Sequence, residues 1–168
     1  MPLLSFRNED ARIVALAITY HLGRPGSETD PTTLLHHDLG LTPVGRALDP
    51  QLAMAEVRLE LTPYQVHRLD EALLGVVNEL KQYDMSHRRS VVPNFETAIG
   101  LLFPELTPEH EGSEDVPGPL DLVGRVVMLR RRLAPVALEA KADIEAQQAA
   151  AAEAERIGKR RWWKPWAR

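Results

Sequence analysis

The sequence predicts a mostly α-helical protein, a compact bundle of about six helices with room for one short two-stranded β element and a long C-terminal helix. Three observations support this fold class. Apolar residues after position 62 recur three and four residues apart, which is the spacing of one helix face. A longer repeat of the same kind fills the C-terminal third of the chain. One short stretch, residues 55–61, alternates apolar and polar residues as a half-buried strand does.

The first 54 residues contain the signals of three helices. Asn8 is placed to cap a helix ending at Gly23, with two acids in the first turn, where the helix dipole favours negative charge. An Asp-Pro pair opens a short helix over residues 30–40. A second Asp-Pro pair opens another helix at residues 49–54.

The alternating stretch at residues 55–61 needs a partner strand. Residues 88–92 are the predicted partner, and Pro93 limits them to the edge of a sheet because proline cannot donate to a ladder. Two helices surround this partner in the sequence. The first has a capping box made by Thr62 and Gln65 and extends to about residue 83, and the second begins after Asn94 and reaches residue 103.

The longest element is expected in the C-terminal third. Apolar residues step by four and three from Leu122 to Ile144, so a helix over residues 122–157 packs partly on the core, with a kink near Pro135. The predicted organisation has a helical core domain, an acidic Pro/Gly-rich loop, this long helix and a basic tail. Their boundaries are residues 1–104, 105–121, 122–157 and 158–168.

Charge is segregated along the chain. The 168 residues carry 20 Lys and Arg against 24 Asp and Glu. Five of the bases and none of the acids lie in residues 158–168, so the tail is +5 and the other residues, with 15 bases against 24 acids, are −9. The absence of cysteine excludes disulfides, Cys-ligated metals and thiol nucleophiles. No apolar run is long enough to cross a membrane, and we expect a cytoplasmic protein.

The basic tail is the strongest candidate binding site. All three tryptophans of the protein lie in it, interleaved with bases, and tryptophan is costly to expose. Such a segment suits an acidic protein groove, single-stranded nucleic acid or an anionic membrane surface. Folding back onto the acidic loop, or packing of the tryptophans on the body, would also cover it. The predicted partner-binding residues are Arg160, Arg161, Trp162, Trp163, Lys164 and Trp166.

A second candidate lies at residues 33–48. This segment, with Leu39-Gly40-Leu41 followed by Thr42, Val44 and Arg46, resembles the bacterial helix-turn-helix motif, which implies DNA binding. The pattern departs from the motif because two residues are missing between the turn and the valine, and the second helix is short. An ordinary corner between two helices is the alternative reading.

A third candidate is a small metal site. His67, Asp70 and Glu71 lie on neighbouring positions of the helix that begins after Thr62, where an imidazole and carboxylates could ligate one ion. No two of the six histidines share the four-residue spacing that chelates zinc on one helix face, and the common catalytic motifs are absent. The expectation for cofactors is therefore none.

From the sequence we expect a non-enzymatic binding or accessory protein that docks a partner protein, or a second copy, through the C-terminal helix and tail. The alternative is a nucleic-acid-binding protein that uses the same tail, together with the degenerate helix-turn-helix segment. A small His/carboxylate metalloenzyme is the third hypothesis.

Overall fold

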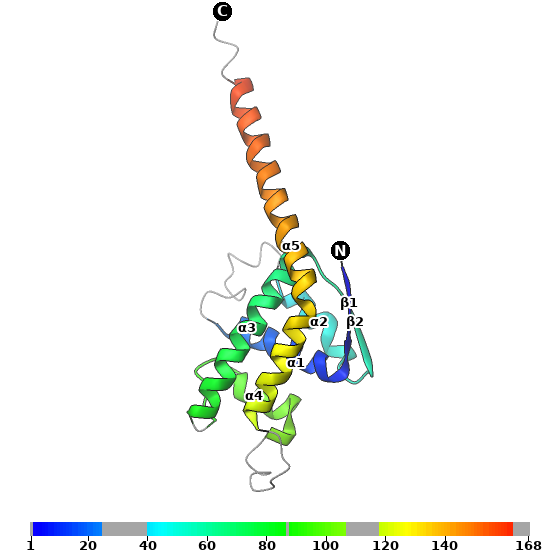
Figure 1. The fold of residues 1–168 in the computed structure, drawn as a ribbon, viewed down its shortest axis with the longest axis vertical. Coiled ribbons are helices and arrows are strands. Elements are labelled where there is room, and N and C mark those ends of the chain that lie inside the picture. Colours follow the sequence, from blue (N-terminus) through cyan, green and yellow to red (C-terminus); the bar gives the residue numbers. More distant parts are fainter. Residues whose placement is uncertain (1, 25–39, 87, 107–117, 163–168) are drawn as a thin grey trace, which may run out of the picture.

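The computed structural model describes residues 2–24, 40–86, 88–106 and 118–162. Two strands, five α-helices and two short 3-10 turns make up the described residues (Figure 1). In chain order they are β1 (Leu3–Arg7), α1 (Asn8–Gly23), α2 (Thr42–Leu48), a 3-10 turn (Asp49–Gln51), β2 (Glu56–Glu60), α3 (Pro63–Met85), α4 (Phe95–Leu102), a second 3-10 turn (Pro104–Leu106) and α5 (Pro119–Trp162).

The predicted fold class is confirmed, with one long C-terminal helix and one two-stranded sheet. Five α-helices lie in the described residues rather than about six. The Asp-Pro pair at position 49 opens a 3-10 turn of three residues instead of a helix. The helix predicted over residues 30–40 lies mostly outside the described residues, as does most of the predicted acidic loop.

The strand at 56–60 is confirmed, but its predicted partner is wrong. β2 pairs antiparallel with β1, so that Leu3 lies opposite Glu60 and Phe6 opposite Val57. Residues 4–7, Leu-Ser-Phe-Arg, alternate apolar and polar as β2 does, and both strands turn their second and fourth residues into the core. This alternation is the signal that identifies β1.

Residues 88–92 form an irregular bend, because side chains take their backbone hydrogen bonds. Arg88 has a left-handed backbone conformation, with φ 63°. The backbone N–H of Ser90 donates to Glu96, and the N–H of Val92 donates to the Ser90 hydroxyl. The same hydroxyl donates to the buried carboxylate of Glu79. Because the backbone N–H groups of Ser90 and Val92 are bonded to side chains, they cannot donate to a neighbouring strand.

Helix α1 is the centre of the molecule, and apolar side chains around most of its girth are buried. It ends at Gly23 as expected, but it begins with Asn8 inside the helix and Arg7 at the cap. The Asn8 amide points elsewhere, because it donates to the backbone carbonyls of Leu52 and Met54, at 2.5 and 3.0 Å. Asn8 therefore ties the start of α1 to the segment that leads into β2.

The start of α3 forms as the sequence predicts. The Thr62 hydroxyl accepts from the backbone N–H of Gln65, and the Gln65 side chain accepts from the N–H of Thr62. The buried Gln65 amide also donates to the carbonyl of Gly40, which fixes the entry to α2. At α4, Asn94 occupies the expected cap position, but with φ 64° and no side-chain capping bond.

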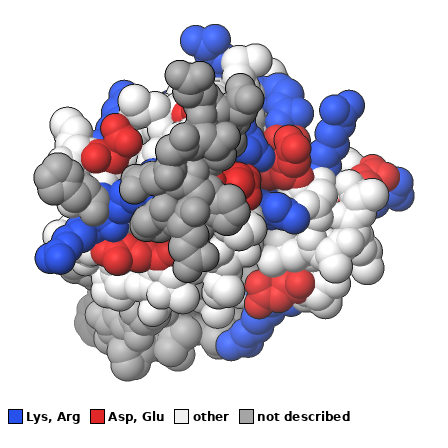
Figure 2. All heavy atoms as spheres, turned by 90° about the horizontal axis from the view of Figure 1, so that it is seen from below, with Lys and Arg blue, Asp and Glu red and all other residues white. Residues whose placement is uncertain are grey.

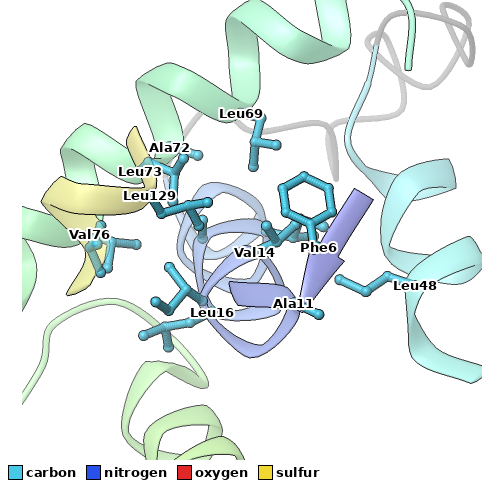
Figure 3. Close-up of a cluster of buried hydrophobic side chains, with 14 of the residues drawn as sticks. Phe6, Ala11, Val14, Leu16, Leu48, Leu69, Ala72, Leu73, Val76 and Leu129 are labelled. Atoms are coloured by element: carbon cyan, nitrogen blue, oxygen red, sulfur yellow. The ribbon is translucent and has the colours of Figure 1, made fainter. Parts of the chain in front are cut away.

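One hydrophobic core joins all these elements (Figure 3). Helix α1 supplies Ala11, Val14 and Leu16 to its middle, and the other helices and β1 close around them. Both strands contribute only one face, because every second residue points to solvent. The further labelled contributors are Phe6 from β1, Leu48 from α2, Leu69, Ala72, Leu73 and Val76 from α3, and Leu129 from α5.

Helix α5 belongs to the core at one end and projects from the body at the other (Figure 1). Its 44 residues span about 66 Å at about 1.5 Å per residue. The helix continues without a break through Pro135, which cannot donate to the carbonyl of Arg131. Both residues are exposed, so water can satisfy that carbonyl.

Among the described residues, no helix is both long enough and apolar enough to cross a membrane.

Gly75, in the middle of α3, is required by the ring of Tyr20. A Cβ at this position would lie 2.1 Å from Cε1 of Tyr20, whose ring packs edge-on against Phe95. We predict that Gly75→Ala lowers the free energy of unfolding by about 1–3 kcal/mol, because the ring must move, although alanine is the better helix former. Urea denaturation measures the change.

The matched control is the same substitution in a Tyr20→Ala background. There the clash is gone, and Gly75→Ala should be neutral or stabilising by up to about 1 kcal/mol. Equal destabilisation in both backgrounds would contradict the assignment.

Candidate binding surface

The predicted partner-binding residues begin where α5 ends. The α5 backbone continues as a helix to Trp162, so Arg160 and Arg161 also lie on its last turns. The side chains of residues 158–162 lie outside what the structure describes, and so do Trp163, Lys164 and Trp166 altogether. The structure therefore places the start of the tail at the end of the projecting helix.

The arm, residues 145–157 of α5, carries the tail away from the body. Every arm residue is exposed, whereas Ala140 and Ile144 just before it are buried. The arm is about 20 Å long at about 1.5 Å per residue. Its composition is alanine-rich, with Glu145, Glu153 and Glu155 as acids and Arg156 as a base. Helix propensity, rather than packing on the body, therefore supports this part of α5.

On one flank, arginines of α5 are tied to acids at the start of α1. Arg132 Nη2 lies 2.6 Å from Asp10 Oδ1, and Arg125 Nη2 lies 3.7 Å from Glu9 Oε2. Arg125 also lies 4.0 Å from Glu105 and stacks over the ring of Phe103. Glu9 and Asp10, placed by the sequence in the first turn of α1, thus serve α5 as well as the helix dipole.

On the other flank, Arg130 is held by a bidentate pair with Asp70 of α3. Its Nε and Nη2 donate to the two carboxylate oxygens at 2.8 and 3.0 Å. The hydrogen bonds and charge of Asp70 raise the pKa of the Arg130 guanidinium above its ordinary value. Two parallel bonds fix the orientation of both side chains.

A hollow of about 480 Å³ opens beside this pair, between α3 and α5. Its lining combines apolar side chains of α5 with basic ones. Arg131 and Lys141 are exposed, and neither forms an ion pair with the residues that the structure describes. The lining residues are His67, Asp70, Val127, Arg130, Arg131, Ala134, Ala137, Leu138 and Lys141.

Two of the three metal candidates, His67 and Asp70, line this hollow, and all three have other partners. Asp70 is taken by Arg130, and His67 Nε2 lies 3.7 Å from Glu71 Oε1. In the described ranges, no three His, Asp or Glu side chains are grouped closely enough to hold a metal ion.

The helix-turn-helix candidate can be followed from position 40 onward. Helix α2 is seven residues long, with Val44 and Leu48 buried and Arg46 exposed as its one base. Gly45 faces α1, because a Cβ there would lie 3.3 Å from Cγ2 of Ile18. Arg46 lines a second, mostly apolar hollow of about 380 Å³ between α1, α2 and α4. Residues 33–39 lie outside the described ranges.

The end of the molecule opposite the arm shows acidic and basic side chains interspersed among the described atoms (Figure 2). On the described face, charge of one sign is therefore not concentrated as it is in the tail sequence.

Sequence reasoning missed the basic flank of α5. This flank is a second stripe of α5, beside the apolar stripe that begins at Leu122. Its members recur at steps of four and three: Val127, Arg131, Ala134, Leu138 and Lys141. The spacing is present in the sequence, but it is easily overlooked because the stripe mixes apolar and basic residues. The usual guide to a helix face is a repeat of apolar residues alone.

Comparison of the chain with family models, with curated proteins and with solved structures found no match.

We predict that Asp70 and Arg130 are energetically coupled. In a double-mutant cycle with Asp70→Ala and Arg130→Ala, the coupling free energy should be about 0.5–1 kcal/mol at low salt, because the pair is bidentate and only partly exposed. Urea denaturation of the four proteins gives the value.

The neighbouring His67–Glu71 pair is the matched control, since it is longer and more exposed. Its coupling should be close to zero at neutral pH. Equal coupling for the two pairs would show that the bidentate geometry adds nothing.

Proposed function

We propose that this protein is a non-enzymatic binding or accessory subunit that docks onto a partner protein through the arm and the basic tail. The observation that carries the proposal is the exposure of every arm residue on a helix that leaves the body (Figure 1). An exposed helix of this length gains nothing for the core, whereas it holds the segment after it about 20 Å from the last buried turn.

The chemistry of the tail supports a groove that is both apolar and acidic. Three indole rings supply large apolar area, and five bases supply positive charge, with no acid among residues 158–168. Tryptophan and arginine are the residues most enriched among the anchors of protein interfaces.

The arm favours a protein partner over a nucleic acid. It carries three acids and one base, so the helix that leads to the tail is net negative. Acidic side chains on the arm repel the phosphates of a nucleic acid, whose affinity for proteins comes largely from the neutralisation of phosphates by bases. A protein groove imposes no such uniform charge on the whole segment.

Truncation after Ile157 tests the proposal. Capture of the partner that copurifies with the intact chain should be lost, while the Tm changes by no more than about 2 °C, because the residues removed lie beyond the described core. A large drop in Tm would mean that the tryptophans pack on the body, which would contradict the proposal.

Two matched variants separate the parts of the tail. One replaces Trp162, Trp163 and Trp166 with Leu and keeps the bases. The other replaces Arg160, Arg161 and Lys164 with Gln and keeps the tryptophans. Both should bind the copurified partner at least about tenfold more weakly, because an anchor needs its apolar area and its charge together.

Intrinsic fluorescence identifies the class of ligand, because every tryptophan of the chain lies in the tail. The purified partner should shift the emission to shorter wavelength, whereas an oligothymidylate or anionic vesicles should not. A shift with the oligonucleotide that disappears steeply with salt would instead establish the nucleic-acid alternative.

A further inference from the structure

We propose that two copies of this chain associate through one stripe of α5, with the two helices antiparallel and their overlap centred at position 143. The stripe begins in the hollow beside α3 and continues along the arm. It consists of Val127, Arg131, Ala134, Leu138, Lys141, Glu145, Gln148, Ala152 and Glu155.

The stripe is one continuous face of α5. Its members step by four and three residues over 29 positions, which is about four heptads and enough for a helix pair. It is distinct from the seam through Leu122, Val126 and Leu129, which is buried in the core. All the stripe residues from Arg131 onward are exposed, including Leu138, whose exposed fraction is 71%.

Charge is ordered along this face. The half that lines the hollow carries the bases Arg131 and Lys141, and the half on the arm carries the acids Glu145 and Glu155. A single α5 therefore presents a positive half followed by a negative half. A second copy is complementary to this order when its helix runs in the opposite direction.

The antiparallel register follows from the spacing. The two-fold axis crosses α5 at the level of position 143, although the side chain of Asp143 is on another face. In this register Lys141 faces Glu145 of the second copy, and Arg131 faces its Glu155. Two-fold symmetry repeats both pairs, which gives four ion pairs in the dimer. A parallel pairing would set each base opposite the same base, where like charges repel.

Small residues in the same register allow close approach. Ala134 faces Ala152 of the second copy, and symmetry repeats this pair. Interaxial distances between packed helices run from about 8 to about 10 Å, and small side chains at the contact give the shorter ones. Leu138 is then covered by Gln148, so the exposed apolar side chain beside the hollow is in contact with the arm of the other chain.

The pairing deepens the proposed function, since the second copy covers one face of the arm. It rests on the same projecting helix. The four ion pairs lie between Arg131 and Glu155, so they need no residue of the tail. A chain truncated after Ile157 should therefore still dimerise while it loses partner capture, so each proposal can fail without the other.

Charge reversal tests the pairing. The variant Glu145→Lys/Glu155→Arg has a wholly basic stripe, and the variant Arg131→Glu/Lys141→Glu has a wholly acidic one. Each should self-associate at least about 100-fold more weakly than the parent chain, because four attractive pairs become repulsive. An equimolar mixture should recover the parent affinity, because every pair between the two variants is again of opposite charge. Sedimentation equilibrium measures all four samples.

The matched control reverses the same number of acids off the stripe. Glu139 and Asp143 are exposed on other faces of α5, so Glu139→Lys/Asp143→Lys should associate as the parent does. Circular dichroism checks that each variant keeps its helix content. A parent chain that stays monomeric at millimolar concentration, or a mixture that does not associate, would overturn the proposal.

Crosslinking reads the direction of the helices, since the natural chain has no cysteine. Leu138→Cys and Gln148→Cys chains should form a mixed disulfide on gentle oxidation, at least about tenfold faster than either chain crosslinks with itself. Faster self-crosslinking of Leu138→Cys would indicate parallel helices and refute the register.

Discussion

The packing of α5 against α3 is the contact on which the rest of the structure depends. Leu122, Val126 and Leu129 of α5 are almost fully buried against the core that α1 and α3 build. Ion pairs on both flanks, to Asp10 and to Asp70, fix the rotation of α5 about its own axis. That rotation decides which stripe remains exposed when the helix leaves the body, so the core determines the geometry of the arm.

The fold class was predictable because local signals and packing agree. The capping box at Thr62 and the apolar repeat of α3 specify a helix at several levels at once. The partner of β2 was not predictable with the same ease, since strand pairing depends on contacts between positions distant in sequence. Side-chain hydrogen bonds from Ser90 and Glu96 removed the expected partner, and these bonds exist only in the folded chain.

The candidate surface was only partly predictable. Composition located the tail, because three tryptophans and five bases in one segment are visible without a structure. The hollow beside α3 was not visible, since it needs His67 and Asp70 from one helix beside Arg131 and Lys141 from another. The sequence reading offered Asp70 to a metal, whereas the fold brings Arg130 within 2.8 Å of it.

The position of Ile144 also bears on how the chain is made. It is the last buried side chain in the described part of α5, and every arm residue after it is exposed. Protein synthesis proceeds from the N-terminus, and folding follows as each unit emerges. Every core residue is therefore synthesised before the arm, and the tryptophans of the tail join the chain only after all the apolar residues that build the body.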